Sequence, residues 1–320
     1  MRKRVVSVAV IGGALTLAGC SGGGSDSAAP ASIKTSDATL IAASVIGAAQ
    51  NVGDLGFFVF FGPTPTLSAP SKSILAAKVG EVRNVAIDAL VRRVRVIPLA
   101  TLSPATTSCT DGGRVTVSGD VAAPGMLTPN DTIVFDFALC REGDATVNGR
   151  VSMQFASFSG DLASDTFSLD VDVQASDLEA TIGGRAATLN GSASLVIDST
   201  PDTLTTTVTS TSVSVAHAGS TSTFSNYSSI TMVTSSSVAR AVNGTLTSSA
   251  FDGSVTFDTT KALEGANRLS TDAGQVVITG ADGGTITFVV LDATSVRLEV
   301  DTNGDGTVDA MFDVPWTGLI

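Results

Sequence analysis

The strongest constraint on the fold is a long stretch in which apolar and polar residues alternate. From Arg114 almost to the C-terminus, apolar residues recur at every second position. Successive side chains of a β-strand point to opposite faces of a sheet, so this period indicates half-buried strands. The clearest runs are Ile133, Phe135, Phe137 and Leu139; Phe167, Leu169, Val171 and Val173; and Ile286, Phe288 and Val290. Turn signals such as Gly183-Gly184 and Pro201-Asp202 separate the runs. We therefore predict a mainly β protein with an antiparallel meander of about a dozen strands, either a curved open sheet or a sandwich.

The middle of this region is unusually rich in hydroxyl side chains. Between Ser199 and Ser249, about half of the residues are Ser or Thr, a composition that would also suit a disordered stalk. Aliphatic and aromatic residues still interrupt it, and threonine favours the pleated backbone of a strand. We therefore predict long solvated strands with one weakly apolar face.

The N-terminal part has a helical pattern instead. Residues 36–51 are rich in Ala, Ile, Leu and Val and predict a short helix, with Gly53 as a possible stop. A second short helix is predicted from Ser71 or Ser73 to Arg95, with Leu75, Val79, Val82 and Ala86 at helical spacing. Its last turn would hold three arginines, which suit either the C-terminal carbonyls of the helix or anionic lipid headgroups.

Four of the chain's 14 phenylalanines lie within the five residues from Phe57 to Phe61. We interpret this pentapeptide as a buried plug or strand, with a lipid-contacting loop as the alternative. Together these patterns predict a helical N-terminal part over residues 33–98 and an antiparallel β domain over residues 99–320.

The first twenty residues carry a secretion signal. Arg2, Lys3 and Arg4 precede the apolar run from Val5 to Leu17, which is too short to span a bilayer and fits a cleavable signal peptide over residues 1–19. The run ends in Leu17-Ala18-Gly19-Cys20, which resembles the lipobox of bacterial lipoproteins. The resemblance implies that Cys20 is acylated and becomes the first mature residue. Acyl chains on Cys20 would anchor the protein to membrane lipid.

Residues 20–32 follow the lipobox and are rich in Gly, Ser and Ala, which predicts a flexible tether. In lipoproteins of the enterobacterial type, an aspartate after the cysteine favours retention in the inner membrane. This chain has Ser21 there, so the resemblance implies a lipid-anchored protein of the bacterial cell envelope, at the outer membrane.

Charge excludes one class of partner. The 18 basic residues less the three of the signal peptide leave 15, against 30 acidic residues, a balance of −15 for the mature chain. Nucleic acid requires a basic surface, and here positive charge gathers only between Lys72 and Arg95. We expect no nucleic-acid partner; a protein or apolar ligand is not specified by the sequence.

After lipidation of Cys20, Cys109 and Cys140 remain as an even pair in a compartment that permits disulfides. We predict that they are bonded and that the strands near them are adjacent in the sheet. A free catalytic thiol is the alternative, but the only histidine, His217, is far away in sequence.

The segment from Asp301 to Asp309 resembles the DxDxDG calcium loop of many extracellular proteins. Oxygen-bearing side chains occupy loop positions 1, 3, 5 and 9, and Gly306 stands at position 6. The predicted calcium ligands are Asp301, Asn303, Asp305 and Asp309, with the carbonyl of Thr307. Phe312 stands where an EF-hand has a bidentate acid, so water or Asp313 would fill that place. The alternative is a bare hairpin turn, because Asn-Gly and Asp-Gly both favour hairpins.

No motif for nucleophilic or zinc chemistry occurs in the sequence, and we do not expect an enzyme. The favoured function is a non-catalytic surface or periplasmic module of the cell envelope, stabilised by calcium. The alternative is a carrier that shields acyl lipid or another apolar ligand within the curved sheet.

Overall fold

The computed structural model describes residues 28–61, 102–122, 127–143, 145–160, 166–182, 185–217, 219–265, 271–316 and 319. Within these described ranges, one α-helix, α1 (Ala38–Phe61), precedes fourteen β-strands and one 3-10 turn, η1 (Ala281–Gly283). The strands are β1 (Leu102–Ser108), β2 (Arg114–Asp120), β3 (Thr132–Glu142), β4 (Ala145–Gly160), β5 (Phe167–Ile182), β6 (Arg185–Ser199), β7 (Thr203–His217), β8 (Ser220–Thr234), β9 (Val238–Ser248), β10 (Ser254–Gly265), β11 (Ala273–Thr279), β12 (Thr285–Val290), β13 (Ser295–Asp301) and β14 (Ala310–Pro315).

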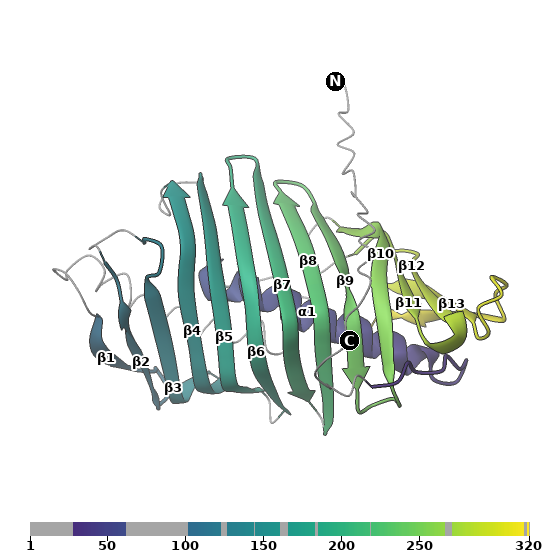
Figure 1. The fold of residues 1–320 in the computed structure, drawn as a ribbon, viewed down its shortest axis with the longest axis horizontal. Helices are drawn as coiled ribbons and strands as arrows, with labels where there is room; N and C mark the ends of the chain where they lie inside the picture. Colours follow the sequence, from purple (N-terminus) through teal and green to yellow (C-terminus); the bar gives the residue numbers. More distant parts are fainter. Residues whose placement is uncertain are drawn as a thin grey trace, which may run out of the picture.

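All fourteen strands belong to one open sheet, and each pairs antiparallel with the next strand of the chain (Figure 1). The predicted mainly β class and antiparallel meander are confirmed. Of the two predicted architectures, the open sheet is the one that forms. The Ser/Thr-rich region forms β7, β8 and β9, so the prediction of strands rather than a stalk is confirmed as well.

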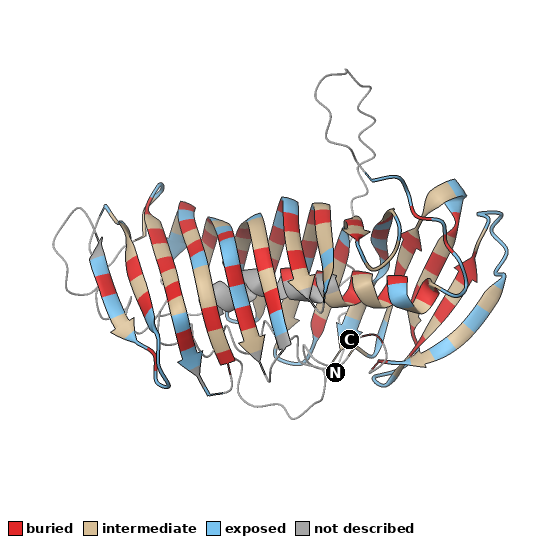
Figure 2. Cartoon of the chain, turned by 90° about the horizontal axis from the view of Figure 1, so that it is seen from below, coloured by how far each residue is buried: buried red, intermediate tan, exposed pale blue. Residues whose placement is uncertain are grey.

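Period-two alternation of burial runs along most strands (Figure 2). In β12, for example, Ile286 and Phe288 are fully buried while the residues between them are half-buried. The buried faces of the strands form one apolar core together with α1. The sequence pattern therefore fixes which face of the sheet turns inward.

Helix α1 differs from the predicted short helix. It begins after Asp37, whose carbonyl accepts the first helical hydrogen bond from Ile41 at 2.9 Å, and it continues for 24 residues. Gly53 lies inside the helix and does not end it. The backbone of Phe57–Phe61 forms the last turns of α1, so the predictions of a strand and of a loop are wrong.

The inward side of α1 packs against the concave side of the sheet. Its buried residues recur at helical spacing and are at most 2% exposed: Ala38, Ile41, Ala42, Val45, Ile46, Ala49 and Val52. The helix contacts β7, β8 and β9 and also β12 and β13. A helix of 24 residues is about 36 Å long, which is enough to cross these strands, and Figures 1 and 2 show it running across them on the inner side of the sheet.

Several sequence predictions lie outside the described residues. They are the signal peptide over residues 1–19, Cys20, the helix predicted between Ser71 and Arg95, and the basic cluster within it. Within the described part of the chain, no helix combines the length and the apolar character needed to cross a membrane.

Candidate functional site

A row of β-bulges crosses the sheet from β3 to β9, with a gap at the β7–β8 pair. The strand register shifts at the middle of four successive pairs, from β3 with β4 to β6 with β7, and again between β8 and β9. A bulge places an extra residue in one strand, bends that strand and increases its twist. Five aligned bulges therefore curve the sheet along one line, which we call the bulge line.

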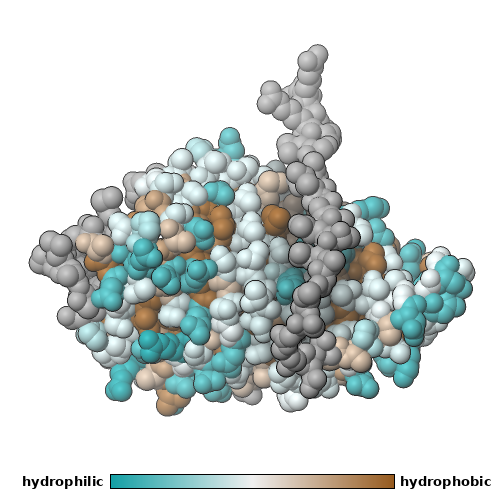
Figure 3. Space-filling view, viewed as in Figure 1, coloured by the Kyte–Doolittle hydropathy of each residue, from teal (hydrophilic) through white to brown (hydrophobic). Residues whose placement is uncertain are grey.

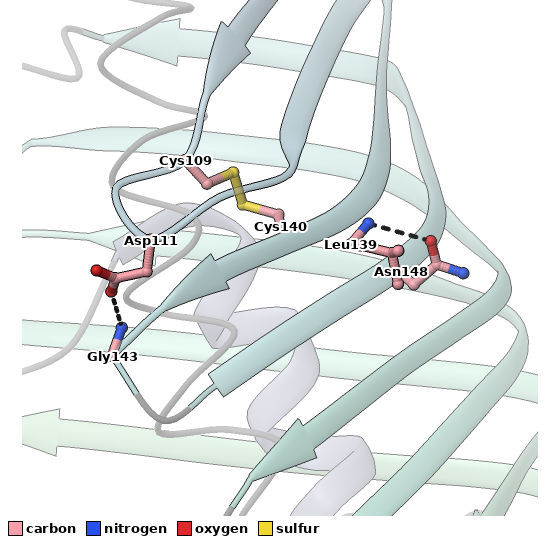
Figure 4. The surroundings of a disulfide bond; sticks show 6 residues. All are labelled: Cys109, Asp111, Leu139, Cys140, Gly143 and Asn148. Atoms are coloured by element: carbon pink, nitrogen blue, oxygen red, sulfur yellow. Dashed lines mark hydrogen bonds between the residues drawn. A yellow bond between two sulfur atoms is a disulfide. The ribbon is translucent and has the colours of Figure 1, made fainter.

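Asn-Gly dipeptides in the middle of strands build the bulge line. Leu139 on β3 has a left-handed φ of 49°, and its N–H is bound by the Asn148 side-chain oxygen at 3.3 Å (Figure 4). Asp177 on β5 repeats this geometry with a φ of 46°, and its N–H donates to the side-chain oxygen of Asn190 at 2.6 Å. A bulged residue loses its ladder partner, and the asparagine of the next strand replaces it.

The glycine of each dipeptide allows the backbone of the strand on its other side to approach closely. Gly149 has a φ of 108°, and a Cβ there would lie 2.1 Å from the carbonyl oxygen of Asp177. A Cβ on Gly191 would lie 2.6 Å from the carbonyl oxygen of Ser212. In each Asn-Gly dipeptide, the asparagine side chain binds the bulged residue of the preceding strand. The glycine leaves space for the backbone of the following strand at its bulge, so bulges lie side by side on successive strands.

This feature was not predicted from the sequence, although a signal was present. The segments Val147-Asn148-Gly149, Leu189-Asn190-Gly191 and Val242-Asn243-Gly244 share an aliphatic residue before Asn-Gly. The third lies opposite Asn226 on β8, which has a φ of 51°. Asn-Gly between apolar runs ordinarily indicates a hairpin turn, and only the strand pairing on both sides places these dipeptides within strands.

Tyr227 fastens the helix to the sheet at the bulge line. It lies within the bulge of β8, is 1% exposed, and donates its hydroxyl proton to the carbonyl oxygen of Ala49 on α1 at 2.9 Å. Its ring packs against Phe224, with ring centroids 5.3 Å apart, and both rings contact Phe257. The chain's only tyrosine therefore joins the curved sheet to the helix with both an aromatic cluster and a hydrogen bond.

The predicted calcium loop joins β13 to β14, and backbone N–H groups already occupy the carboxylate of Asp301. One oxygen of this carboxylate accepts the N–H groups of Asn303 and Gly304 at 3.2 and 2.7 Å, and the other accepts that of Gly306 at 2.8 Å. Asp301 is 6% exposed. Its burial opposes ionisation, but the backbone N–H groups around it outweigh burial and lower the pKa of the carboxyl group.

The other predicted ligands make similar contacts within the loop. Asn303 accepts the N–H of Asp305 at 2.9 Å through its side-chain oxygen, and Asp305 accepts the N–H of Thr307 at 2.7 Å. Asp309 accepts both the hydroxyl and the N–H of Thr302, and these bonds lower its pKa. The loop therefore compensates its own negative charge through N–H and O–H donors, and the repulsion that would demand a cation is reduced.

Asp313 does not complete the loop. It lies on β14 directly opposite Arg297, which donates to its two oxygens at 2.8 and 3.3 Å. The hydrogen bond from Arg297 lowers the pKa of Asp313. The expectation that Asp313 replaces the missing EF-hand acid is wrong, because the strand register assigns this carboxylate to an arginine.

In the described ranges, three or more His, Cys, Asp or Glu side chains do not gather into a group that could hold a metal ion. Calcium also accepts amide and carbonyl oxygens, and each carboxylate oxygen has a second lone pair. The calcium site at Asp301, Asn303, Asp305, Thr307 and Asp309 stays a prediction.

Cys109 and Cys140 form a disulfide, as predicted, with their Cα atoms 5.5 Å apart (Figure 4). Cys109 belongs to the β1–β2 connection, and β2 pairs directly with β3, which carries Cys140, so the expectation of adjacent strands near the two cysteines is confirmed. The β1–β2 connection folds over the end of β3. There the N–H of Arg141 donates to Gly112 at 2.8 Å, and Asp111 accepts the N–H of Gly143 at 2.7 Å.

A shallow open hollow of about 610 Å³ lies beside the β9–β10 connection. Hydroxyl side chains contribute much of its lining, among them Thr221, Thr223, Thr247, Ser248 and Ser249. Ala28, Ala250 and Phe251 complete a mixed polar and apolar lining, and the hollow lies at the end of the sheet, away from the apolar interior in which a carrier would hold acyl chains.

Comparison of the chain with protein families, with curated proteins and with solved structures finds no match.

Proposed function

We propose that this chain is a non-catalytic lipoprotein module of the bacterial cell envelope, anchored through acylated Cys20. The observation that supports a module over a carrier is the contact between α1 and the sheet. The helix residues that face the sheet are at most 2% exposed, and Tyr227 is bonded to the helix backbone. The chain's own helix covers the concave face at β7, β8, β9, β12 and β13, and so occupies that part of the surface that a carrier would offer to an acyl chain.

The anchor is tested by expressing the full chain and its Cys20→Ser variant in a Gram-negative host. We expect the wild type to begin at an acylated residue 20 and to partition into detergent, because the thiol is both the acylation and the cleavage mark. The variant should remain an uncleaved precursor. A variant that is still processed at this position and still partitions into detergent would refute the lipoprotein proposal.

Native mass spectrometry separates the module from the carrier. We expect residues 21–320, exported to the periplasm behind a signal peptide without a lipobox and extracted without detergent, to be detected as the bare chain. A co-purified species with the mass of a phospholipid or fatty acid, lost on mild activation, would favour the carrier instead.

Calcium would stabilise the C-terminal hairpin of this module. Without a bidentate acid the site should be weak, with a dissociation constant of ~10⁻⁴–10⁻³ M. Calcium at a hundred times that constant should raise the free energy of unfolding by roughly 2.7 kcal/mol. We expect Asp305→Ala to lose this response and the exposed strand variant Asp258→Ala to keep it. Identical wild-type melting curves in chelator and in excess calcium would leave the segment as a hairpin turn.

A further inference from the structure

The first described residues are fixed to one end of the sheet. Ala31 donates its N–H to Ser254 at 2.8 Å, and Ser254 donates its own to Ala29 at 2.9 Å. Ala31 also accepts the N–H of Ala281 at 2.6 Å. The side chains of Ala31 and Ile33 are 3% exposed. Residues 28–33, which we call the strap, are therefore part of the folded sheet, and the predicted flexible tether to residue 32 is shorter than expected.

The strap marks one end of the meander. In an antiparallel meander, every connection from an odd strand to the next even strand lies at the same end. Ser254 begins β10, and Ala281 lies in the β11–β12 connection, so the strap is at this end. The disulfide-bonded β1–β2 connection and the acidic β13–β14 loop lie there too. We call it the strap end.

Chain length limits how far the strap end can lie from an acylated Cys20. Eight residue steps separate Cys20 from Ala28, and a fully extended chain covers about 28 Å in that number of steps. The 15 residues of β7 span about 50 Å. The anchor therefore confines one end of the sheet to the neighbourhood of the bilayer and leaves the other end free to lie much farther away.

The charge of the sheet opposes a flat orientation. The face turned away from α1 is coloured mostly white and teal in Figure 3, with smaller apolar patches. Along β3 to β6, this face carries five acidic side chains against two basic ones: Asp136, Asp170, Asp172, Glu179 and Asp198, with Arg141 and Arg150. Anionic lipid repels such a face over distances shorter than about 8 Å. The acidic β13–β14 loop differs from this face, because its carboxylates accept N–H and O–H donors within the loop.

We propose that the strap end is the membrane-facing surface of this protein and that its partner there is the bilayer that carries the acyl chains of Cys20. The sheet stands away from the bilayer, and the β2–β3, β4–β5, β6–β7 and β8–β9 connections point outward. This orientation rests on the proposed lipidation of Cys20. It assigns the acidic β13–β14 loop and the disulfide to the membrane side and the opposite end to any soluble partner.

Fluorescence energy transfer to the membrane surface tests the orientation. The exposed residues Asp252 and Ser236 lie at the two ends of β9, whose 11 residues span about 36 Å. Lipidated full-length Asp252→Cys and Ser236→Cys variants are each labelled with a maleimide donor. They are then incorporated into vesicles of phosphatidylethanolamine and phosphatidylglycerol (3:1) with an acceptor on the headgroups. Because Cys109 and Cys140 are bonded and Cys20 is acylated, the introduced thiol is the labelling site.

We expect several-fold more transfer from position 252 than from position 236. Eight Gly/Ser residues inserted after Gly24 should reduce transfer from position 252, because the longer tether releases the strap end. Equal transfer from both positions, or more from position 236, would overturn the proposed orientation. Co-flotation with the vesicles is recorded in each sample. Flotation with equal transfer rejects the orientation alone, whereas a wild type that does not float rejects the lipid anchor on which it rests.

Discussion

The bulge line makes a quantitative prediction at Gly149. This residue has a φ of 108°, and a Cβ would lie 2.1 Å from the carbonyl oxygen of Asp177. Gly149→Ala therefore incurs two costs: backbone strain of about 1–3 kcal/mol and a steric overlap of about 1–3 kcal/mol, relieved only if β4 and β5 move apart. We expect the free energy of unfolding to fall by about 2–6 kcal/mol, a large part of the 5–15 kcal/mol typical of a folded protein.

The chain offers a matched control for this substitution. Gly112 has a nearly equal φ of 115°, but a Cβ there would have no atom within 4 Å. Gly112→Ala should incur the strain without the overlap. The assay is urea unfolding of both variants, followed by circular dichroism, with stability taken from the midpoint and slope. Equal losses in the two variants would refute the argument that the close approach of Asp177 requires glycine in the strand.

Three further predictions concern the helix contact, the disulfide and the acidic loop. Tyr227→Phe keeps the ring contacts and loses the hydrogen bond to Ala49, so urea unfolding should show a loss of about 1 kcal/mol; an unchanged midpoint would contradict a role for the hydroxyl. Replacement of both Cys109 and Cys140 by Ser should lower the free energy of unfolding by roughly 3–4 kcal/mol, because the bond closes a loop of 31 residues; equal midpoints for oxidised wild type and variant would argue against this. The pKa of Asp301 is lowered in the folded state, so the ionised carboxylate stabilises the fold. This contribution to the free energy of unfolding is present above the ordinary pKa of about 4 and is lost as the pH falls through the lowered value. Unfolding measured from pH 6 to pH 2 should show a shallower acid loss in Asp301→Asn than in the wild type, and parallel curves would count against the loop as the cause.

Local patterning of the sequence was sufficient to predict the strands but not their curvature. The alternation at Ile286, Phe288 and Val290 depends only on neighbours within one strand, and the structure buries all three. The bulge at Asp177 depends on Asn190 and Gly149, which belong to different strands and lie on opposite sides of it. Such a relation requires the register of two strand pairs at once, and one sequence does not specify that register before the strands are paired.

The loop at Asp301 illustrates a different limit. The spacing of its oxygens predicts a calcium loop or a hairpin turn between two strands, and the same oxygens can face a cation or the loop's own N–H groups. The structure gives Asp301 three such N–H donors. Sequence spacing does not distinguish these uses, because an Asx turn and a calcium loop select the same small polar residues. Asp313 was misassigned for a related reason: its partner Arg297 lies on the neighbouring strand.

The continuation of α1 through Gly53 follows from its contacts with the sheet. Glycine inside a helix costs about 1 kcal/mol relative to alanine, which is why its position suggested a stop. The turn that precedes it is held by tertiary contacts: Val52 is 1% exposed, and Tyr227 binds the carbonyl oxygen of Ala49, the helical acceptor for residue 53. Burial of an aliphatic side chain contributes about 1.5–3 kcal/mol and the hydrogen bond about 1 kcal/mol, so together they exceed the cost of the glycine. Tyr227 lies within the bulge of β8, so the bulge that bends this strand also positions the side chain that binds the helix one turn before Gly53.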